Sequence, residues 1–524
     1  MYNSPDPESR NMVHSVAKVF IKEGLVKALN EGQGSVFEGA LDYFSDSDID
    51  ALIIKGYAGT GKTFLVRKLI EYILQTDEQS KIAILAPTNK AVKVLYKGSA
   101  NNKTGQKVYM FDDVFDSDSR IVYSTVHKML ALREVIKDNG EQVFEADTWG
   151  AADISEYTHF FIDEGFMVSD KLCAELISNT PGAKIIFLGD PAQVPPIGKA
   201  ESVLLEQQSA FKFKQLELTE IMRQKGDNAI IKNSFLIREN LLVHNPIPNL
   251  YTELNANGEG VIHVDAITER NEIYKIIERY VKDLAFKEDP DFFKILTWKR
   301  ETSDYINGIA REIMYGKDTP RFVVGERLLT TKPVLEKFQK KYGKKSYINW
   351  RVTMSNSEEL TVEQIALGEI RVTEDFPVQI YKCYDLTVSY LDPFDNQIIR
   401  KVIKVLHEDS RPECYAKMDE MHKLALQGIH KGNWVKYYNF LKYFAYVDYN
   451  YALTVHRAQG STYENVLVLE EDIDKNFKIK ERNRIKYTAY TRASKRLYVL
   501  KRNESPKQIY KDYRTEDYTS CGPT

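Results

Sequence analysis

The residues best suited to chemistry form one glycine-rich run, Gly56-Tyr57-Ala58-Gly59-Thr60-Gly61-Lys62-Thr63. An apolar stretch at residues 51–54 precedes this run, and a helical pattern at residues 64–70 follows it. Strand, glycine-rich loop and helix in this order predict a phosphate-binding P-loop. The glycines let successive backbone N–H groups point at phosphate oxygens, and the helix N-terminus adds the positive end of its dipole.

Two side chains in this loop have distinct expected roles. Lys62 is expected to reach the β- and γ-phosphates, and Thr63 is expected to offer its hydroxyl group to Mg²⁺. A chance glycine turn is the alternative, but the fixed positions and both flanks are correct. The sequence therefore predicts a site for a nucleoside triphosphate and Mg²⁺.

A pair of carboxylates, Asp163 and Glu164, follows the apolar run His159–Ile162. Asp163 can hold Mg²⁺, directly or through water, and Glu164 can polarise an attacking water molecule. Adjacent acids are also common on plain surfaces, but an idle charge directly after a buried strand would be costly. We therefore expect both residues to be functional.

Three further side chains suit the chemistry of phosphoryl transfer. Gln193, in the polar turn after the apolar run 185–188, could sense the γ-phosphate, although Gly-Asp-Pro is also ordinary turn chemistry. Arg223 and Arg492 could stabilise the negative charge that grows in the transition state. A single arginine is more often a surface charge, so the assignment of this role to the two arginines depends on the sequence pattern around them.

Composition bounds the class of protein. A chain of 524 residues is long enough for several domains, and a net charge of −3 neither indicates nor excludes a nucleic-acid partner. The four cysteines are scattered and show no zinc or disulfide spacing, which fits a reducing compartment. No signal-peptide pattern or membrane-spanning run is present, so we expect a cytoplasmic enzyme without a membrane partner.

Alternating apolar strands and amphipathic helices predict an α/β fold with parallel sheets. Asn139-Gly140 between two short alternating runs predicts a β-hairpin at about 131–149, which on geometry alone is most simply an inert surface hairpin. Residues 101–120 read as a polar insertion. The expected organisation is a helical segment 1–46, a first α/β domain 47–215, a second α/β domain formed by 216–330 and 446–520, and an inserted, barrel-like domain 331–445.

The inserted domain begins with a basic segment. Its cations alternate with aromatic residues, so they could neutralise phosphates while rings stack on bases. A solvated, charged loop over core aromatics explains the same pattern equally well. The segment contains Lys332, Lys337, Lys340, Lys341, Lys344, Lys345 and Arg351 with Phe338, Tyr342, Tyr347 and Trp350.

These motifs form an ordered series that resembles superfamily-one DNA helicases, specifically their RecD-like branch. The most specific member of the series is Thr454-Val455-His456-Arg457-Ala458-Gln459-Gly460-Ser461-Thr462. The likeness extends from about residue 31 to residue 500. It implies two RecA-like domains that share one ATP in their cleft and move along one strand.

The resemblance also implies roles for individual residues at the nucleotide. Gln33 matches the glutamine that reads adenine, and Gln193 matches the glutamine that couples nucleotide state to DNA. Arg223 and Arg492 match the arginine fingers, while Asp163 and Glu164 match the metal ligand and the catalytic base. The remaining expected nucleotide contacts are Gly56, Ala58, Gly59, Thr60, Gly61, Lys62, Thr63 and Gly460.

Positions that touch the single strand in such helicases are occupied here by Thr88, Asn89, Thr125, His127, Thr454 and His456. Asn89 departs from the family histidine, so any ring contact there is lost. The resemblance makes the hairpin the pin that separates the strands, with Phe144 at the position of the pin aromatic. Trp434 and Tyr438 fall where relatives have a tryptophan pair, and the tyrosine departs from that pattern.

The implied activity is ATP-dependent 5′-to-3′ translocation on single-stranded DNA with separation of forked duplex DNA. The polarity comes from the resemblance alone. An RNA helicase, a DNA translocase that does not unwind and a regulatory ATP-binding module remain alternatives. A monomer, with a single-strand-binding protein or replisome components as further partners, is the expectation.

Overall fold

The computed structural model describes residues 18–57, 59–97, 100–101, 107–108, 118–137, 139–146, 154–196, 199, 201–206, 210–220, 228–244, 247, 250–266, 270–342, 345–373, 377–391, 397–428 and 432–501. They form two compact units. The first unit combines the chain up to Pro191 with Pro195–Lys225 and Asp318–Asn450. The second combines Ala192–Val194, Gly226–Lys317 and the chain from Tyr451 onward.

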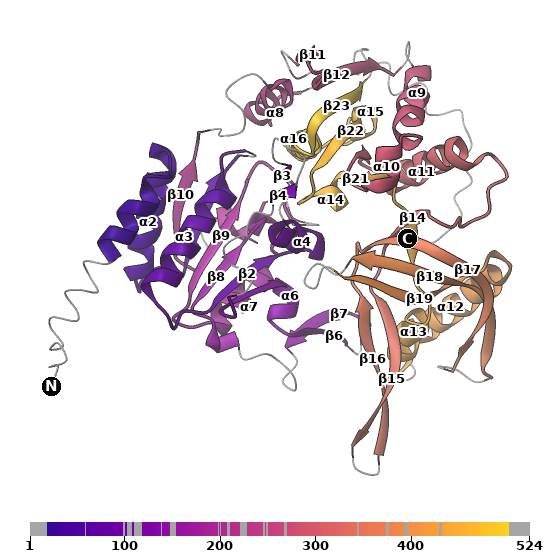
Figure 1. Ribbon diagram of the computed structural model, residues 1–524. Helices are drawn as coiled ribbons and strands as arrows, with labels where there is room; N and C mark the ends of the chain where they lie inside the picture. The colour runs from indigo at the N-terminus through magenta and orange to yellow at the C-terminus, as the bar shows by residue number, and fades with distance from the viewer. Residues whose placement is uncertain are drawn as a thin grey trace. The chain divides into compact units, whose positions relative to one another are not determined.

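A parallel sheet of six strands forms the centre of the first unit (Figure 1). The strand order places β9 between the P-loop strand β1 and the carboxylate strand β8, which confirms the predicted parallel α/β sheet. In order across the sheet, the strands are β10 (Phe213–Leu218), β1 (Ala51–Gly56), β9 (Lys184–Gly189), β8 (His159–Ile162), β2 (Ile82–Ala86) and β5 (Ile121–Thr125).

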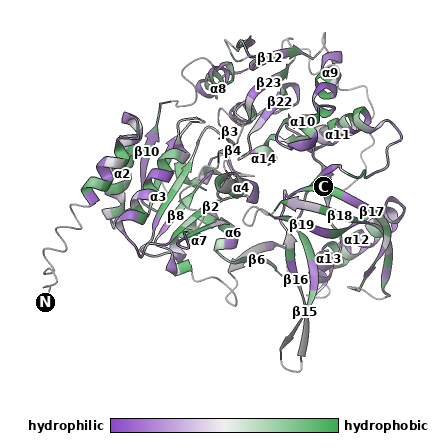
Figure 2. Ribbon diagram, viewed as in Figure 1, coloured by the Kyte–Doolittle hydropathy of each residue, from purple (hydrophilic) through white to green (hydrophobic). Residues whose placement is uncertain are grey.

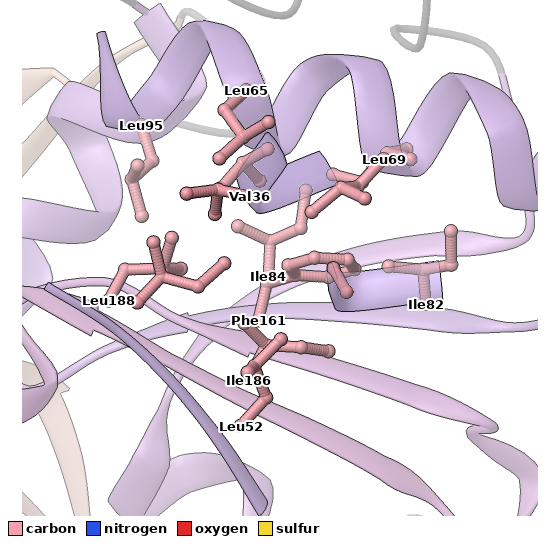
Figure 3. Close-up of a cluster of buried hydrophobic side chains, with 14 of the residues drawn as sticks. Val36, Leu52, Leu65, Leu69, Ile82, Ile84, Leu95, Phe161, Ile186 and Leu188 are labelled. Carbon is pink, nitrogen blue, oxygen red and sulfur yellow. The ribbon is translucent and has the colours of Figure 1, made fainter. Parts of the chain in front are cut away.

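The inner strands of this sheet are buried on both faces, so they consist of continuous apolar runs, such as the hydrophobic β2 and β8 in Figure 2. On one face, Leu52, Ile84 and Phe161 pack against Val36 and Leu69 (Figure 3). Alternate strand residues pack on the other face, because successive side chains point to opposite sides. The covering helices are α2 (Glu31–Ser45), α3 (Lys62–Thr76) and α4 (Asn89–Lys97) on the first face, and α6 (Val126–Met129) and α7 (Asp170–Asn179) on the second.

The predicted hairpin is confirmed. Strands β6 (Leu132–Ile136) and β7 (Gln142–Ala146) pair antiparallel, and Gly140 takes a positive φ of 84° in the turn between them. A positive φ is a conformation that glycine adopts without strain, which explains the Asn-Gly signal. Within the predicted insertion at 101–120, the short strands β3 (Ala100–Asn101) and β4 (Lys107–Val108) also pair antiparallel.

The inserted domain belongs to the first unit, although the chain inserts it into the second α/β domain. Its antiparallel sheet has the order β19-β18-β17-β14-β20, and the hairpin β15–β16 extends from it as a long two-stranded arm (Figure 1). Two helices cover one part of this sheet around buried Tyr381, Cys383 and Phe440. The elements are β14 (Arg327–Thr330), β15 (Val334–Tyr342), β16 (Lys345–Met354), β17 (Glu359–Val372), β18 (Gln379–Leu391), β19 (Ile398–Leu406), α12 (Arg411–Leu426), α13 (Asn433–Leu441) and β20 (Val447–Tyr449).

A second six-stranded sheet, with the order β11-β12-β23-β22-β13-β21, forms the centre of the second unit. All its pairings are parallel except that of β11 with β12. The elements are α8 (Ala229–Glu239), β11 (Glu253–Leu254), β12 (Gly260–Asp265), α9 (Arg270–Val281), α10 (Leu284–Glu288), β13 (Phe293–Thr297), α11 (Arg300–Tyr315), β21 (Ala452–Thr454), α14 (Val455–Ala458), β22 (Tyr463–Leu469), α15 (Glu470–Ile473), α16 (Ile479–Tyr490) and β23 (Ala493–Lys501).

The structure corrects three predicted domain boundaries. Strand β10 pairs with β1, so the first domain continues past residue 215 to at least Leu218. Strands β14 and β20 pair within the inserted sheet, so the inserted domain begins before residue 331 and ends after residue 445. Each misplaced strand lies next to a boundary, where strand pairing decides the assignment and the sequence pattern does not show it. None of the described helices has the length and apolar character needed to cross a lipid bilayer.

Candidate nucleotide-binding site and nucleic-acid contacts

The P-loop has a left-handed backbone at two glycines, Gly59 (φ 87°) and Gly61 (φ 80°). Helix α3 begins directly after Gly61, and no side chain caps its N-terminus. The first N–H groups of α3 are therefore oriented toward the loop, where they can donate to phosphate oxygens. Lys62 Nζ donates to the carbonyl oxygens of Gly56 (2.7 Å) and Tyr57 (2.9 Å), which holds the ammonium group inside the loop.

The carboxylate pair lies at the end of β8. Asp163 and Lys62 line one pocket together with Thr63 and the apolar side chains of Ile84 and Phe161. Burial raises the pKa of the Asp163 carboxyl group above its ordinary value, and the nearby charge of Lys62 opposes that rise. Glu164 takes a left-handed conformation (φ 50°), which is strained for a residue with a side chain and is found at functional sites.

The donors in this pocket fit Mg²⁺. A threonine hydroxyl group and a carboxylate are hard oxygen ligands, and Mg²⁺ in such sites takes its other ligands from phosphates and water. Among the described residues, no group of three or more His, Cys, Asp or Glu side chains forms a separate metal site. Thr63 and Asp163 are therefore the residues that would hold the ion beside the phosphates.

Gln33 lies against the P-loop, as its predicted role requires, and is 1% exposed. Its Nε2 donates to the carbonyl oxygen of Thr60 (3.3 Å), and its Oε1 accepts from the backbone N–H of Asn30 (3.3 Å). Asn30 caps α2 and completes a capping box with Gln33. The Asn-x-x-Gln spacing could have predicted this helix start from the sequence. Adenine binding at Gln33 would replace the bond to Thr60.

Gln193 and Gln459 lie together in the second unit. Gln459 Nε2 is 3.4 Å from Gln193 Oε1 and 3.4 Å from the carbonyl oxygen of Val194. Both side chains are buried, with 7% and 4% exposed. The structure thus brings two of the sequence motifs into direct contact.

Arg492 is held at the end of α16. Its guanidinium group donates to the carbonyl oxygens of Thr488 and Ser461, both at 3.0 Å, and to Thr491 Oγ1 at 2.9 Å. Gly460, directly before Ser461, has a positive φ of 76°. Ala58 and Arg223 lie outside the described residues.

The residues of the first unit that are predicted to contact single-stranded DNA lie at the N-terminal ends of two helices. Thr88 Oγ1 and Thr125 Oγ1 accept from backbone N–H groups at the first turns of α4 and α6, each at 3.2 Å. Asn89 begins α4, and His127 lies in α6, where burial lowers its pKa. Threonine hydroxyl groups and an imidazole suit contact with a nucleic-acid backbone, which carries no sequence information.

The second unit repeats this arrangement. Thr454 ends β21, and His456 lies in the short helix α14. Burial lowers the pKa of His456, and the negative charge of Glu481 partly opposes this. Both units therefore present a threonine followed two residues later by a partly buried histidine.

Trp434 and Tyr438 lie against the hairpin turn. Tyr438 Oη donates to the carbonyl oxygen of Gly140 (2.9 Å), and a Cβ atom added at Gly140 would stand 2.4 Å from the Trp434 ring. The two rings stack with centroids 5.9 Å apart. Sequence reasoning missed this contact, and no local signal could have shown it. DNA contact by these rings stays a prediction, as does that of Phe144, whose side chain lies outside the described residues.

In the basic segment of the inserted domain, Lys337 contacts protein rings. Its ammonium group donates to Tyr443 Oη and lies 5.7 Å from the centre of the Trp350 ring. Arg351 pairs with Glu336 (2.8 Å) on the neighbouring strand. These two cations therefore make contacts within the protein, and contact of this segment with nucleic acid stays a prediction.

Several known proteins are similar to this chain. Residues 28–243 match the model of an AAA domain, and residues 449–500 match the model of the UvrD-like helicase C-terminal domain. An uncharacterised protein of Acanthamoeba polyphaga mimivirus is 25% identical over 501 residues, covering 87% of this chain and 96% of the relative. The ATP-dependent DNA helicase dda of Enterobacteria phage T4 is 24% identical over 455 residues, covering 84% and 92%. The structure of the Pif1 helicase from Candida albicans aligns with a TM-score of 0.41 at 15% identity, covering 92% of this chain and 97% of that one.

The fold and site define a P-loop protein with two RecA-like parallel sheets. Its ordered motifs and the two family matches support a superfamily-one helicase of the RecD/Pif1 type.

Replacing Glu164, the predicted catalytic base, should separate nucleotide binding from hydrolysis. The Glu164→Gln variant keeps the shape of the side chain but cannot accept a proton, so we expect nucleotide affinity within about threefold of wild type and ATP turnover lowered by about 10²-fold or more. A fluorescent ATP analogue measures the affinity, and phosphate release measures the turnover. The control is Glu239→Gln, an exposed end-of-helix residue. Unchanged turnover in Glu164→Gln would contradict the assignment.

The raised pKa of Asp163 predicts that this residue lowers the stability of the nucleotide-free protein while it supports ligand binding. A carboxyl group with a raised pKa in the folded state favours folding while protonated, and this contribution is lost as pH rises through that pKa. At neutral pH, Asp163→Asn should therefore raise the unfolding temperature of the nucleotide-free protein. It should also abolish the stabilisation by Mg–nucleotide, which is about 2.7 kcal/mol at a hundredfold excess over Kd. Thermal melts with and without Mg–nucleotide test both parts, and a large stabilisation retained by the variant would contradict the second.

Proposed function

We propose that the protein is an ATP-dependent DNA helicase that moves 5′ to 3′ on single-stranded DNA and separates forked duplexes. The observation that carries the proposal is the P-loop site with Lys62, Asp163 and Glu164, in a chain that aligns along most of its length with a phage enzyme named as an ATP-dependent DNA helicase. The polarity and the preference for DNA rest on relatives, because no side chain in the site dictates either.

In this proposal, the residues around the phosphates share the work of hydrolysis. Lys62 leaves the carbonyl oxygens of Gly56 and Tyr57 to donate to the β- and γ-phosphates. Glu164 orients a water molecule and accepts its proton, while Arg492 and Arg223 donate to the oxygens that gain charge. Mg²⁺ held by Thr63 and Asp163 would neutralise phosphate charge when bound. Contacts at Thr88, Thr125, Thr454 and His456 would grip the strand backbone.

The β6–β7 hairpin is proposed as the pin that separates the strands. A pin has to resist the force of the duplex, so its turn needs support from behind. The stacked rings of Trp434 and Tyr438 supply that support at Gly140. Action as a monomer, partners such as a single-strand-binding protein and a cytoplasmic location stay predictions.

The first test is ATP turnover without nucleic acid, with single-stranded DNA and with single-stranded RNA. We expect DNA to stimulate turnover by about tenfold or more, and stimulation should fall steeply with salt because phosphate contacts dominate binding. Equal or greater stimulation by RNA would move the RNA-helicase alternative ahead. No stimulation by either would favour the ATP-binding module. Forked duplexes with a single 5′ or 3′ tail then test polarity.

Variants behind the hairpin should uncouple unwinding from ATP hydrolysis. Trp434→Ala removes the ring that packs against Gly140, and Tyr438→Phe removes the hydrogen bond to its carbonyl oxygen. We therefore expect fork unwinding to slow by about tenfold while DNA-stimulated ATP turnover stays within about twofold of wild type. Tyr415→Phe, on the exposed surface of α12, is the matched control. Fork unwinding unaffected by Trp434→Ala would favour a translocase in which the hairpin is inert.

A further inference from the structure

A buried ionic cluster in the second unit is used by none of the motifs described above. Lys486 Nζ lies 2.7 Å from Glu470 Oε1 and 2.6 Å from Asp474 Oδ1. Tyr490 Oη donates to the second oxygen of Glu470 (2.7 Å). The side chains of Lys486 and Glu470 are only 1% and 5% exposed. Lys486 and Tyr490 hold the pKa of the Glu470 carboxyl group below its ordinary value despite its burial.

The spacing of these residues fixes one position of helix α16. Lys486 and Tyr490 are four residues apart, so they lie on one face of the helix, one turn from each other. Glu470, which directly follows β22, lies between them and bonds to both. A shift of α16 by one residue would place Ile485 or Tyr487 opposite the carboxylate and remove the ammonium group of Lys486 from a buried charge, which is unfavourable.

Helix α16 ends at the residues that hold Arg492. The guanidinium group of Arg492 donates to the carbonyl oxygen of Thr488 within α16 and to that of Ser461, which lies in the motif 454–462. The backbone N–H of Tyr463 also donates to the carbonyl oxygen of Arg492 (2.8 Å). The position of α16 along its axis therefore decides whether the guanidinium group meets Ser461.

We propose that Lys486, together with Glu470 and Asp474, is a positioning residue for Arg492. The cluster holds α16 in the single register in which Arg492 bridges Thr488 and Ser461. A buried ion pair contributes little stability compared with apolar packing of the same volume, and its best-attested use is to specify register. The inference rests on the proposed function, because it assigns Arg492 its part in ATP hydrolysis.

A purely structural role would give a different result from a positioning role. Loss of structure lowers the unfolding temperature and lowers turnover regardless of which residue stands at position 492. Loss of positioning lowers kcat through Arg492 alone, so it has no further effect once Arg492 is removed. A double-mutant cycle separates the two, because residues that act through one another are not additive.

The experiment compares ATP turnover of Lys486→Met, Arg492→Ala and the double variant with wild type, with single-stranded DNA present. We expect Lys486→Met to lower kcat by about tenfold or more while the KM for ATP changes by less than about twofold, because the phosphate site of the first unit is intact. In the Arg492→Ala background, the same substitution should change kcat by less than about twofold. The matched control is Lys282→Met, which breaks an exposed lysine–glutamate pair of the same unit (2.6 Å).

Each outcome decides between the roles. An equal loss of kcat in both backgrounds, or normal kcat in Lys486→Met, overturns the positioning role. Should Lys486→Met fail to fold, Tyr490→Phe and Glu470→Gln remove one bond each and complete the same cycle. A wild-type protein that hydrolyses ATP without responding to single-stranded DNA would overturn the proposed function, while the cycle could still be read from the unstimulated rate.

Discussion

The constraint on which the structure depends is the burial of the first sheet on both faces. Parallel strands with helices on either side have their carboxyl ends at one edge. Strands β1 and β8 are separated only by β9, so the P-loop after β1 and the carboxylates after β8 reach the same pocket. Lys62 and Asp163, about a hundred residues apart in the chain, meet there because the sheet brings the ends of their strands together. The apolar packing shown in Figure 3 thus supports the sheet whose edge carries the two side chains of the proposed phosphate and Mg²⁺ site.

Most of this arrangement could be predicted because its signals are local. The apolar runs, the P-loop glycines and the acidic pair are each recognisable within a stretch of about ten residues. The rules of parallel-sheet topology then bring the carboxyl ends of these strands together. The boundary at residue 215 was wrong for the opposite reason. Phe213–Leu218 mixes apolar and polar residues, and nothing in it shows that its partner is β1, because only long-range pairing assigns such an edge strand to one of the two sheets.

The hairpin shows the same limit at a single residue. Asn139-Gly140 predicted the turn, since glycine tolerates the positive φ that the turn requires. Gly140 has a second constraint that the sequence does not show. The Trp434 ring occupies the space where a side chain would stand, and Tyr438 bonds to the same residue across 298 positions of sequence. Local turn chemistry and a distant packing contact thus select glycine independently, and only the first can be predicted from a single sequence.

The inserted domain contacts the P-loop domain at two points. The chain inserts it into the second α/β domain, but its contacts place it in the first unit. Tyr438 bonds to the hairpin turn, and Glu359 at the start of β17 pairs with Lys90 in α4 (2.7 Å), with side chains 24% and 14% exposed. An exposed ion pair contributes little, but a partly desolvated one at a second contact point resists rotation about the first. Two contacts well apart in the sequence therefore join the inserted domain to the P-loop domain, so that in the proposed pin role a force on the hairpin would pass to the unit that contains the P-loop.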